Sequence, residues 1–286
     1  MLPLAIRAIG CKAHAALERS GGMLAAVTGF DNAPYARAGG EIIWIGTGEV
    51  AMHPRAVVLH DANRPVAGAR LSAGARTPWR PARLPVNAGA AAVRERCAWL
   101  HRDLMRIGEP VGEPRGFAAM LAGRAPDFPL DRAAPRVHQL ARAFHADGID
   151  AVYGAALPLL GLGPGLTPSG DDVVGAALFA RQAIAGSPAE ATAWNDLALR
   201  LVDAAGKRSH AIGAALFGDL AMGESFAPLH ELAAALAAAG NHERAIDAAR
   251  ALVAIGHSSG WEMLAGFFIG ITGTLSPYRQ TRESNR

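Results

Sequence analysis

Short apolar runs separated by turn residues occupy the first third of the chain. The runs at residues 24–28, 41–45, 56–60 and 69–71 are rich in β-branched and other apolar side chains, and clusters of glycine, proline, asparagine and aspartate lie between them. This pattern is typical of strands joined by turns. Residues 1–20 alternate small and apolar residues, and we expect them to form a short opening helix. The pattern predicts a β-rich region over residues 1–90.

From residue 93 onward, apolar positions recur at helical spacing. Val93, Cys97, Leu100, Leu104 and Ile107 follow the repeat of three or four residues that marks one face of a helix. Residues 108–131 are rich in glycine and proline, and we expect them to be irregular around a short helix at 117–121. Further helices are expected at residues 135–147, 151–160, 171–185, 189–218, 229–239, 243–255 and 260–272.

The strand pattern and the helical pattern together predict an α+β protein. Its parts are a β-rich N-terminal region over residues 1–90, a larger and predominantly α-helical region over residues 91–275, and a polar tail at 276–286 that we expect to be frayed. The helical region contains two segments, residues 173–180 and 263–271, that are apolar on every side. Such helices are buried against neighbours.

Composition excludes several classes of protein. The charge of +3 and the pI near 9.2 are only mildly basic, arginines are scattered, and 6% of residues are aromatic, so we expect no nucleic-acid partner. The two cysteines, Cys11 and Cys97, form no zinc spacing and no disulfide framework, which fits a reducing cytoplasm. No secretory pattern is present, and the uncharged residues 263–277 are too few to span a membrane. We therefore expect a cytoplasmic protein with no membrane partner.

The most informative segment is residues 161–172, GLGPGLTPSGDD, directly before the apolar run at 173–180. A glycine-rich loop that leads into a buried helix presents unpaired N–H groups and the positive end of the helix dipole. Such a junction can receive an anion, or its own side chains can close it. The candidate ligand-binding residues here are Gly163, Gly165, Thr167, Ser169 and Gly170.

A second segment, residues 256–262 (GHSSGWE), repeats this design before residues 263–271. Ser169-Gly170-Asp171-Asp172 aligns with Ser259-Gly260-Trp261-Glu262, so an acid follows each serine by three positions. That is the spacing of a capping box, and one interpretation is therefore two well-capped core helices. Capping does not require the upstream glycines, and the alternative is a binding site. The candidates in this segment are Ser258, Ser259, Gly260 and Glu262.

Three further groups could carry chemistry. Asp171 and Asp172 point about 100° apart on a helix, so one can cap while the other faces the loop as a base or holds Mg²⁺, although no cofactor is firmly implied. His257 could be a general acid or could only be a polar residue at the helix start. Lys207 and Arg208 could neutralise a bound phosphate or carboxylate, or could form a solvated helix face.

Several common motifs are absent from the sequence. No lysine follows the glycines as in a phosphate-binding P-loop, and the spacing of a dinucleotide fingerprint is missing. No Gly-x-Ser-x-Gly elbow and no His-Glu-x-x-His zinc motif occurs.

GLGPGLTPSGDD and IGHSSGWEMLAG resemble the signatures of the AllH family, most strongly over residues 159–270. This family, formerly catalogued as a domain of unknown function, includes a subunit of oxamate carbamoyltransferase, which acts with two other subunits in anaerobic allantoin breakdown. That enzyme interconverts oxalurate and phosphate with oxamate and carbamoyl phosphate. The chain departs from the family pattern at Glu262, where aspartate is usual, and at Ser209-His210, where threonines are usual.

The resemblance implies a subunit of a carbamoyl-transferring enzyme, with a small anionic substrate such as carbamoyl phosphate or oxamate and with other subunits as partners in an oligomer. Two alternatives stay open. The chain could bind a small anion without catalysis, or it could be an assembly subunit whose glycine loops are only tight turns. We also predict that the two glycine-rich segments meet in space, because they share the Ser-Gly-x-acid form and each leads into a helix with small residues that allow close packing.

Overall fold

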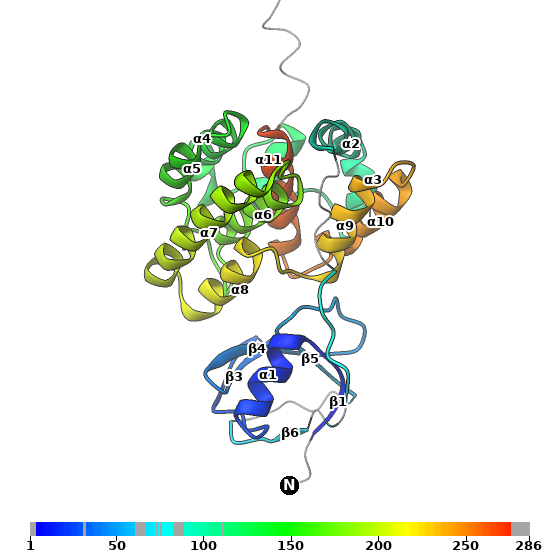
Figure 1. Ribbon diagram of the computed structural model, residues 1–286, viewed down its shortest axis with the longest axis vertical. Helices are drawn as coiled ribbons and strands as arrows, with labels where there is room; N and C mark the ends of the chain where they lie inside the picture. Colours follow the sequence, from blue (N-terminus) through cyan, green and yellow to red (C-terminus); the bar gives the residue numbers. More distant parts are fainter. Residues whose placement is uncertain are drawn as a thin grey trace, which may run out of the picture. The chain divides into compact units, whose positions relative to one another are not determined.

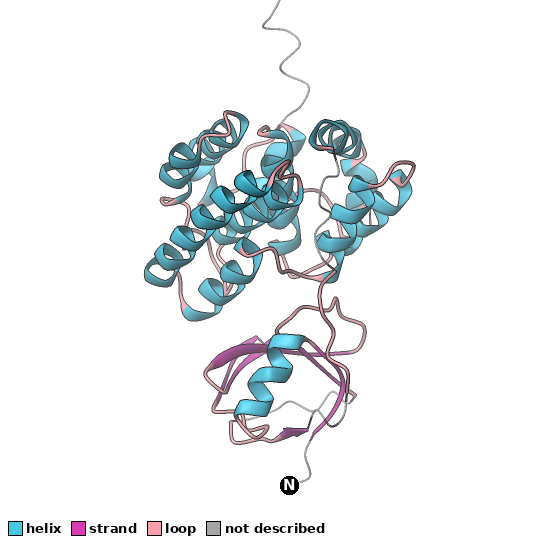
Figure 2. Ribbon diagram, in the orientation of Figure 1, coloured by secondary structure: helices cyan, strands magenta, loops and turns pink. Residues whose placement is uncertain are grey.

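The computed structural model describes residues 4–30, 33–60, 67–72, 74, 76–82, 89–109 and 111–275, so the expected tail at 276–286 lies outside the described residues. The chain divides into two compact units (Figure 1). The sheet unit comprises Met1–Ala82 with Ser225–Ala227, and the helical unit comprises Arg83–Glu224 with Pro228–Arg286. Strands belong to the first unit and most helices to the second (Figure 2), which confirms the α+β class.

The sheet unit contains a six-stranded sheet in the order β2-β3-β4-β5-β1-β6. The strands are β1 (Leu4–Ile9), β2 (Ala26–Phe30), β3 (Ala33–Ala38), β4 (Glu41–Thr47), β5 (Ala56–Leu59) and β6 (Leu71–Ser72), with helix α1 at Cys11–Arg19. The expected opening helix is wrong for residues 4–9, which form β1 between β5 and β6 because this strand completes the sheet. The expected strands at 41–45 and 56–60 are confirmed as β4 and β5.

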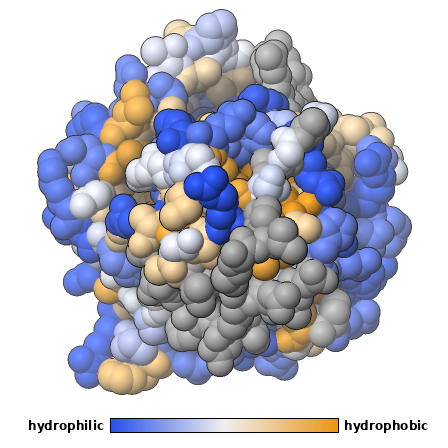
Figure 3. Space-filling model, turned by 90° about the horizontal axis from the view of Figure 1, so that it is seen from below, coloured by the Kyte–Doolittle hydropathy of each residue, from blue (hydrophilic) through white to orange (hydrophobic). Residues whose placement is uncertain are grey.

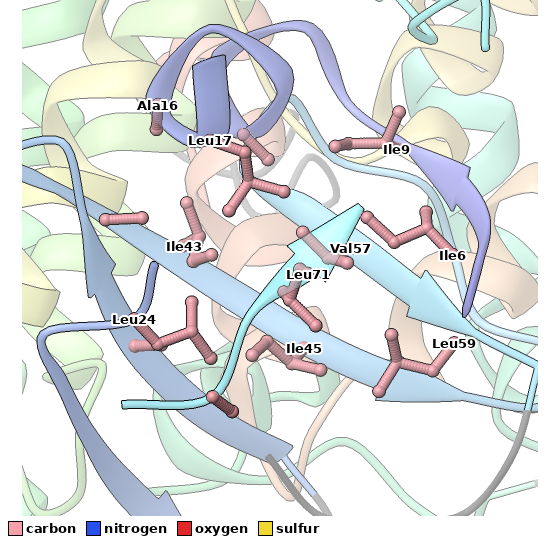
Figure 4. Close-up of a cluster of buried hydrophobic side chains, with 14 residues drawn as sticks. Ile6, Ile9, Ala16, Leu17, Leu24, Ile43, Ile45, Val57, Leu59 and Leu71 are labelled. Atoms are coloured by element: carbon pink, nitrogen blue, oxygen red, sulfur yellow. The ribbon is translucent and has the colours of Figure 1, made fainter. Parts of the chain in front are cut away.

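The β3–β4 hairpin turns at Gly39 and Gly40, where φ is +52° and +83°. A two-residue hairpin loop with positive φ at both positions favours glycine, because other residues are strained there. One face of the sheet and helix α1 enclose a core of aliphatic side chains (Figure 4). In that core Leu17 of α1 lies among side chains that include Ile43 of β4 and Val57 of β5, all at most 3% exposed.

A tripeptide from far along the chain completes the sheet unit. The Phe226 ring contacts the His53 ring at a centroid distance of 4.6 Å and the Trp44 ring at 6.5 Å. The N–H of Ala227 donates a hydrogen bond to the carbonyl of Met52 at 2.8 Å. Residues 225–227 are therefore part of the sheet unit, although the residues on either side of them belong to the helical unit.

The helices of the larger unit account for most of its described residues. They are α2 (Ala90–Arg102), α3 (Leu104–Gly108), α4 (Ala134–His145), α5 (Ile149–Ala156), α6 (Ser169–Ala183), α7 (Pro188–Arg208), α8 (Ala211–Ala221), α9 (Ala227–Ala237), α10 (His242–Val253) and α11 (Ser259–Thr272), with 3₁₀ helices η1 (Gly116–Ala122) and η2 (Leu130–Ala133). A single helix over residues 189–218 was expected. It is divided into α7 and α8, because the imidazole of His210 accepts a hydrogen bond from the N–H of Gly213 and starts a new helix.

Helices α6 and α11 lie side by side in the middle of the helical unit (Figure 1). Both are buried along almost their whole length, as predicted. Glycines allow this close packing: a Cβ at Gly266 would lie 2.2 Å from the carbonyl oxygen of Val173, and one at Gly270 would lie 2.2 Å from that of Ala177. The backbones therefore touch, and the N-terminal ends of the two helices are held in a fixed relation.

The C-terminal end of α6 is anchored by a buried arginine. The Arg181 guanidinium pairs with Asp147, donates to the carbonyl of Phe144 at 2.6 Å, and lies 5.0 Å from the centre of the Trp194 ring.

On the face shown in Figure 3, hydrophobic residues form small scattered groups among hydrophilic ones. No helix among the described residues is both long and apolar enough to cross a membrane.

Candidate functional site

Asp171, in the first turn of α6, connects the glycine-rich loop to the break between α7 and α8. Its Oδ1 accepts the N–H of Gly161 at 2.7 Å, and its Oδ2 accepts the hydroxyl of Ser209 at 2.5 Å. Burial raises the pKa of Asp171, while these two hydrogen bonds and the nearby His210 oppose the rise. Asp171 thus fixes the start of the loop at residues 161–168.

His210 holds the other end of this loop. Its Nδ1 accepts the N–H of Gly213 at 3.3 Å, so in the neutral ring the proton is on Nε2, which donates to the carbonyl of Gly165 at 3.2 Å. Within the loop, the N–H of Gly170 donates to the carbonyl of Leu162 at 2.8 Å. A ligand at the start of α6 would consequently have to use N–H groups other than that of Gly170.

Asp172 is 5% exposed, and its Oδ2 has no hydrogen-bond partner among the residues that the structure describes. Burial raises its pKa well above the usual range. The charge of Asp171 adds to the rise, and the hydroxyls of Ser259 and Thr167 oppose it. Those hydroxyls lie 2.7 Å apart. Thr167 and Ser259 are both partly exposed, and both hydrogen-bond to Asp172 through their side chains.

Glu262, in the first turn of α11, is fully buried. Its two oxygens accept the N–H of Phe117 at 3.2 and 3.0 Å. Burial raises its pKa well above the usual range, and the charge of Asp172 raises it further, while Ser169 and Phe117 oppose the rise. The residue before Phe117 is Gly116, where a Cβ would lie 1.9 Å from Oε1 of Glu262. The start of η1 therefore lies against the site, in addition to the starts of α6 and α11.

The serine of each Ser-Gly-x-acid segment interacts with the acid of the other segment. The hydroxyl of Ser169 hydrogen-bonds to Glu262, and that of Ser259 hydrogen-bonds to Asp172. The second residue of each segment is equally crowded: a Cβ at Gly170 would lie 1.9 Å from the carbonyl oxygen of Leu159, and one at Gly260 would lie 2.0 Å from that of Leu252. The arrangement is a pseudo-symmetric pair of helix starts.

The expectation that the two glycine-rich segments meet is confirmed by the Thr167–Ser259 hydrogen bond. The interpretation of the two segments as capping boxes is wrong. Helix α6 is preceded by Pro168 and α11 by Ser258, and neither residue makes a side-chain capping bond. Asp172 and Glu262 interact across the junction instead of with their own helices, because the other helix supplies hydroxyl partners within reach.

The remaining candidates lie at the surface. Lys207 pairs with Asp203 at 2.6 Å on an exposed face of α7, as its alternative interpretation expected. The side chains of Arg208 and His257 are exposed, and Arg208 approaches the loop through its carbonyl oxygen, 2.2 Å from where a Cβ of Gly161 would be. Gly163 and Gly165 lie in the loop itself, and Ser258 precedes α11. A role in ligand binding stays a prediction for these residues.

Sequence reasoning missed four residues that shape the site: Gly116, Phe117, Ser209 and His210. The last two adjoin Lys207 and Arg208 and could have been included by proximity. Gly116 and Phe117 are 145 or more residues from Glu262, and no spacing rule indicates them. Within the described ranges, no group of three or more histidine, cysteine, aspartate or glutamate side chains is placed to hold a metal ion.

Part of the helical unit matches a known protein family. Residues 159–271 match the family model of AllH, described as oxamate carbamoyltransferase subunit AllH. The match begins before the first glycine-rich loop and ends in α11, so it contains Asp171, Asp172 and Glu262. The resemblance to the AllH family is thereby confirmed for this part of the chain. No curated protein and no solved structure matches the chain.

Proposed function

We propose that this chain, whose residues 159–271 match the AllH family, is an AllH-like subunit of a carbamoyl-transferring enzyme in purine or allantoin nitrogen catabolism. Its ligand is a small carboxylate or phosphate, such as oxamate or carbamoyl phosphate. The ligand binds where the starts of α6 and α11 meet. Other subunits of a carbamoyltransferase complex are its partners, in keeping with the word subunit in the family's description.

One observation carries the location of the site. Two helix N-termini meet around Asp172, whose buried Oδ2 lacks a partner among the described residues. Leaving a buried polar atom without a hydrogen bond costs about 1–3 kcal/mol, so such atoms are few in native proteins and call for an explanation. A ligand atom at this position would supply the missing bond.

The surroundings suit a small oxygen-rich ligand. Helix N-termini carry partial positive charge and attract anions, and here α6 and α11 both begin at the junction. The hydroxyls of Thr167 and Ser259 can donate hydrogen bonds to an oxygen. Carbamoyl transfer passes through a tetrahedral centre with oxyanion character, and fixed donors of this kind stabilise such a centre.

Calorimetry on the full chain tests the proposal, with oxamate, oxalurate, phosphate and carbamoyl phosphate as probes. We expect at least one probe to bind, and Thr167→Val to weaken that binding about tenfold through the loss of one hydrogen bond to a charged ligand. Thr192→Val, on the exposed surface of α7, is the matched control and should bind as the wild type does. Absence of binding for all four probes, both alone and with copurifying subunits and Mg²⁺, would refute the proposal.

The second candidate is a subunit that binds the small anion without catalysing its reaction, or that serves assembly. The observation in its favour is that His257, the expected general acid, is exposed and at the surface of the loop before α11. Turnover of carbamoyl phosphate and oxamate by the assembled complex distinguishes the two. For a non-catalytic site, Thr167→Val should weaken anion binding and leave both the kcat and the KM values of the assembled complex unchanged.

A further inference from the structure

Three buried carboxyl groups lie at the junction, and their partners differ. Asp171 accepts two hydrogen bonds from Gly161 and Ser209, which suit the ionised form. Glu262 accepts the N–H of Phe117. Asp172 interacts with the hydroxyls of Thr167 and Ser259, and its Oδ2 has no hydrogen-bond partner among the described residues. Of the three, Asp172 is the group with an atom left for a ligand.

Positive charge is scarce around these groups. The charged neighbours that act on them are Asp171 and Asp172 themselves and, for Asp171, His210 at the start of α8. Among the described residues, no lysine or arginine forms an ion pair with any of the three carboxyl groups. Burying several unpaired charges side by side is very costly, and carboxyl groups in that position remain protonated instead. The raised pKa values of Asp172 and Glu262 agree with this argument.

We propose that Asp172 meets the ligand as a neutral carboxylic acid and donates a hydrogen bond from Oδ2 to a ligand oxygen, an inference that rests on the proposed function. The acceptor is a carboxylate or carbonyl oxygen of a small molecule such as oxamate. Glu262 is a positioning residue: it is neutral as well, and it holds η1 through Phe117 while it shares the buried space with Asp172.

This assignment explains how an anion can bind beside three acids. With Asp172 and Glu262 neutral, only Asp171 carries a negative charge, and its oxygens are already occupied by Gly161 and Ser209. The vacant Oδ2 then adds a donor to those of Thr167 and Ser259. The same atom in an ionised carboxylate would repel the ligand.

Two substitutions at one position separate the neutral donor from a carboxylate. Asn is nearly isosteric with Asp and presents an N–H donor without charge, whereas Ala removes the group. In calorimetry of the full chain with oxamate, we expect Asp172→Asn to bind within about threefold of the wild type and Asp172→Ala to bind at least about tenfold more weakly. Asp150→Asn, at a carboxyl that is 94% exposed, is the control and should leave the affinity unchanged.

The pH dependence provides a second readout that does not depend on Asp172→Ala folding. Oxamate stays ionised throughout, so the wild-type affinity should be constant below the pKa of Asp172 and fall about tenfold for each pH unit above it, since binding then requires one proton. In Asp172→Asn this fall should be absent. Equal losses in Asp172→Asn and Asp172→Ala, or the same alkaline fall in both wild type and Asp172→Asn, would overturn the inference. Either result would leave the proposed function standing, whereas no oxamate binding to any variant, together with no binding of the other three probes, would refute both.

Discussion

Gly266→Ala tests whether backbone contact between α6 and α11 sets the geometry of the site. The added Cβ would lie 2.2 Å from the carbonyl oxygen of Val173 and 3.0 Å from the Cβ of Ala176. An ordinary contact needs 3.4 Å or more, so the two helices must separate by about 1 Å. The obstacle is backbone, which cannot rotate aside as a side chain can.

The expected magnitude follows from two opposing effects. Overpacking a core costs about 1–3 kcal/mol, and the rigid neighbour places this substitution at the upper end. Alanine gains about 1 kcal/mol over glycine in a helix, so the net loss of unfolding free energy is about 2 kcal/mol. Gly206→Ala in α7 is the matched control: nothing lies within 4 Å of its added Cβ, so it should gain up to about 1 kcal/mol.

Urea unfolding followed by far-ultraviolet circular dichroism measures the difference, because most helices of the chain belong to the helical unit. The two variants should differ by about 3 kcal/mol in unfolding free energy. Gly266→Ala should also weaken oxamate binding, since Thr167 and Ser259 would no longer be 2.7 Å apart. If Gly266→Ala proves as stable as Gly206→Ala, the close packing of α6 and α11 as described is incorrect.

Four further substitutions have expected outcomes. Glu262→Gln should become increasingly stable relative to the wild type as pH rises above about 4.5, because the raised pKa of Glu262 makes its ionisation oppose folding. Urea unfolding at a series of pH values measures this difference in unfolding free energy. A difference that stays constant with pH would contradict the prediction. Gly116→Ala should lower the thermal midpoint by several degrees, since its Cβ would lie 1.9 Å from Glu262 and its φ is +59°; an unchanged midpoint would argue against that contact. Asp147→Asn should cost about 3–5 kcal/mol in urea unfolding, because it leaves the Arg181 guanidinium, which is 2% exposed, without its ion pair, and Arg181→Met should cost less, because the Asp147 that it leaves unpaired is 58% exposed; the reverse order would contradict this reasoning.

The two buried helices could be predicted from the sequence because their information is local. Residues 173–180 and 263–271 are apolar on every side, and the glycines before them indicate close backbone approach. The β4 and β5 strands were evident for the same reason, as short apolar runs between turn residues. Strand β3, APYARA, was not evident, because its alanines and its proline carry little β-propensity and its place is set by pairing with β2 and β4.

The site was predictable only in part, because its decisive contacts are distant in sequence. The Ser-Gly-x-acid spacing indicated residues that meet at the junction, but it suggested the wrong hydrogen-bond partners, since a capping box and a bond between two helices have the same sequence pattern. The break at His210 was hidden because histidine is not among the preferred capping residues and the flanking sequence is rich in alanine and apolar residues. The contact of Glu262 with Phe117 required the fold itself.

The position of α11 at the end of the described chain has a consequence for synthesis. Thr167 and Ser259 are 92 residues apart, and α11 covers α6. Because translation adds about 5–20 residues per second, roughly 5–20 s pass between the synthesis of α6 and that of α11. During that time the apolar surface of α6 has no α11 to cover it. The nascent chain is therefore most exposed to chaperones and to aggregation in this interval, and slowing translation between α6 and α11 would lengthen it.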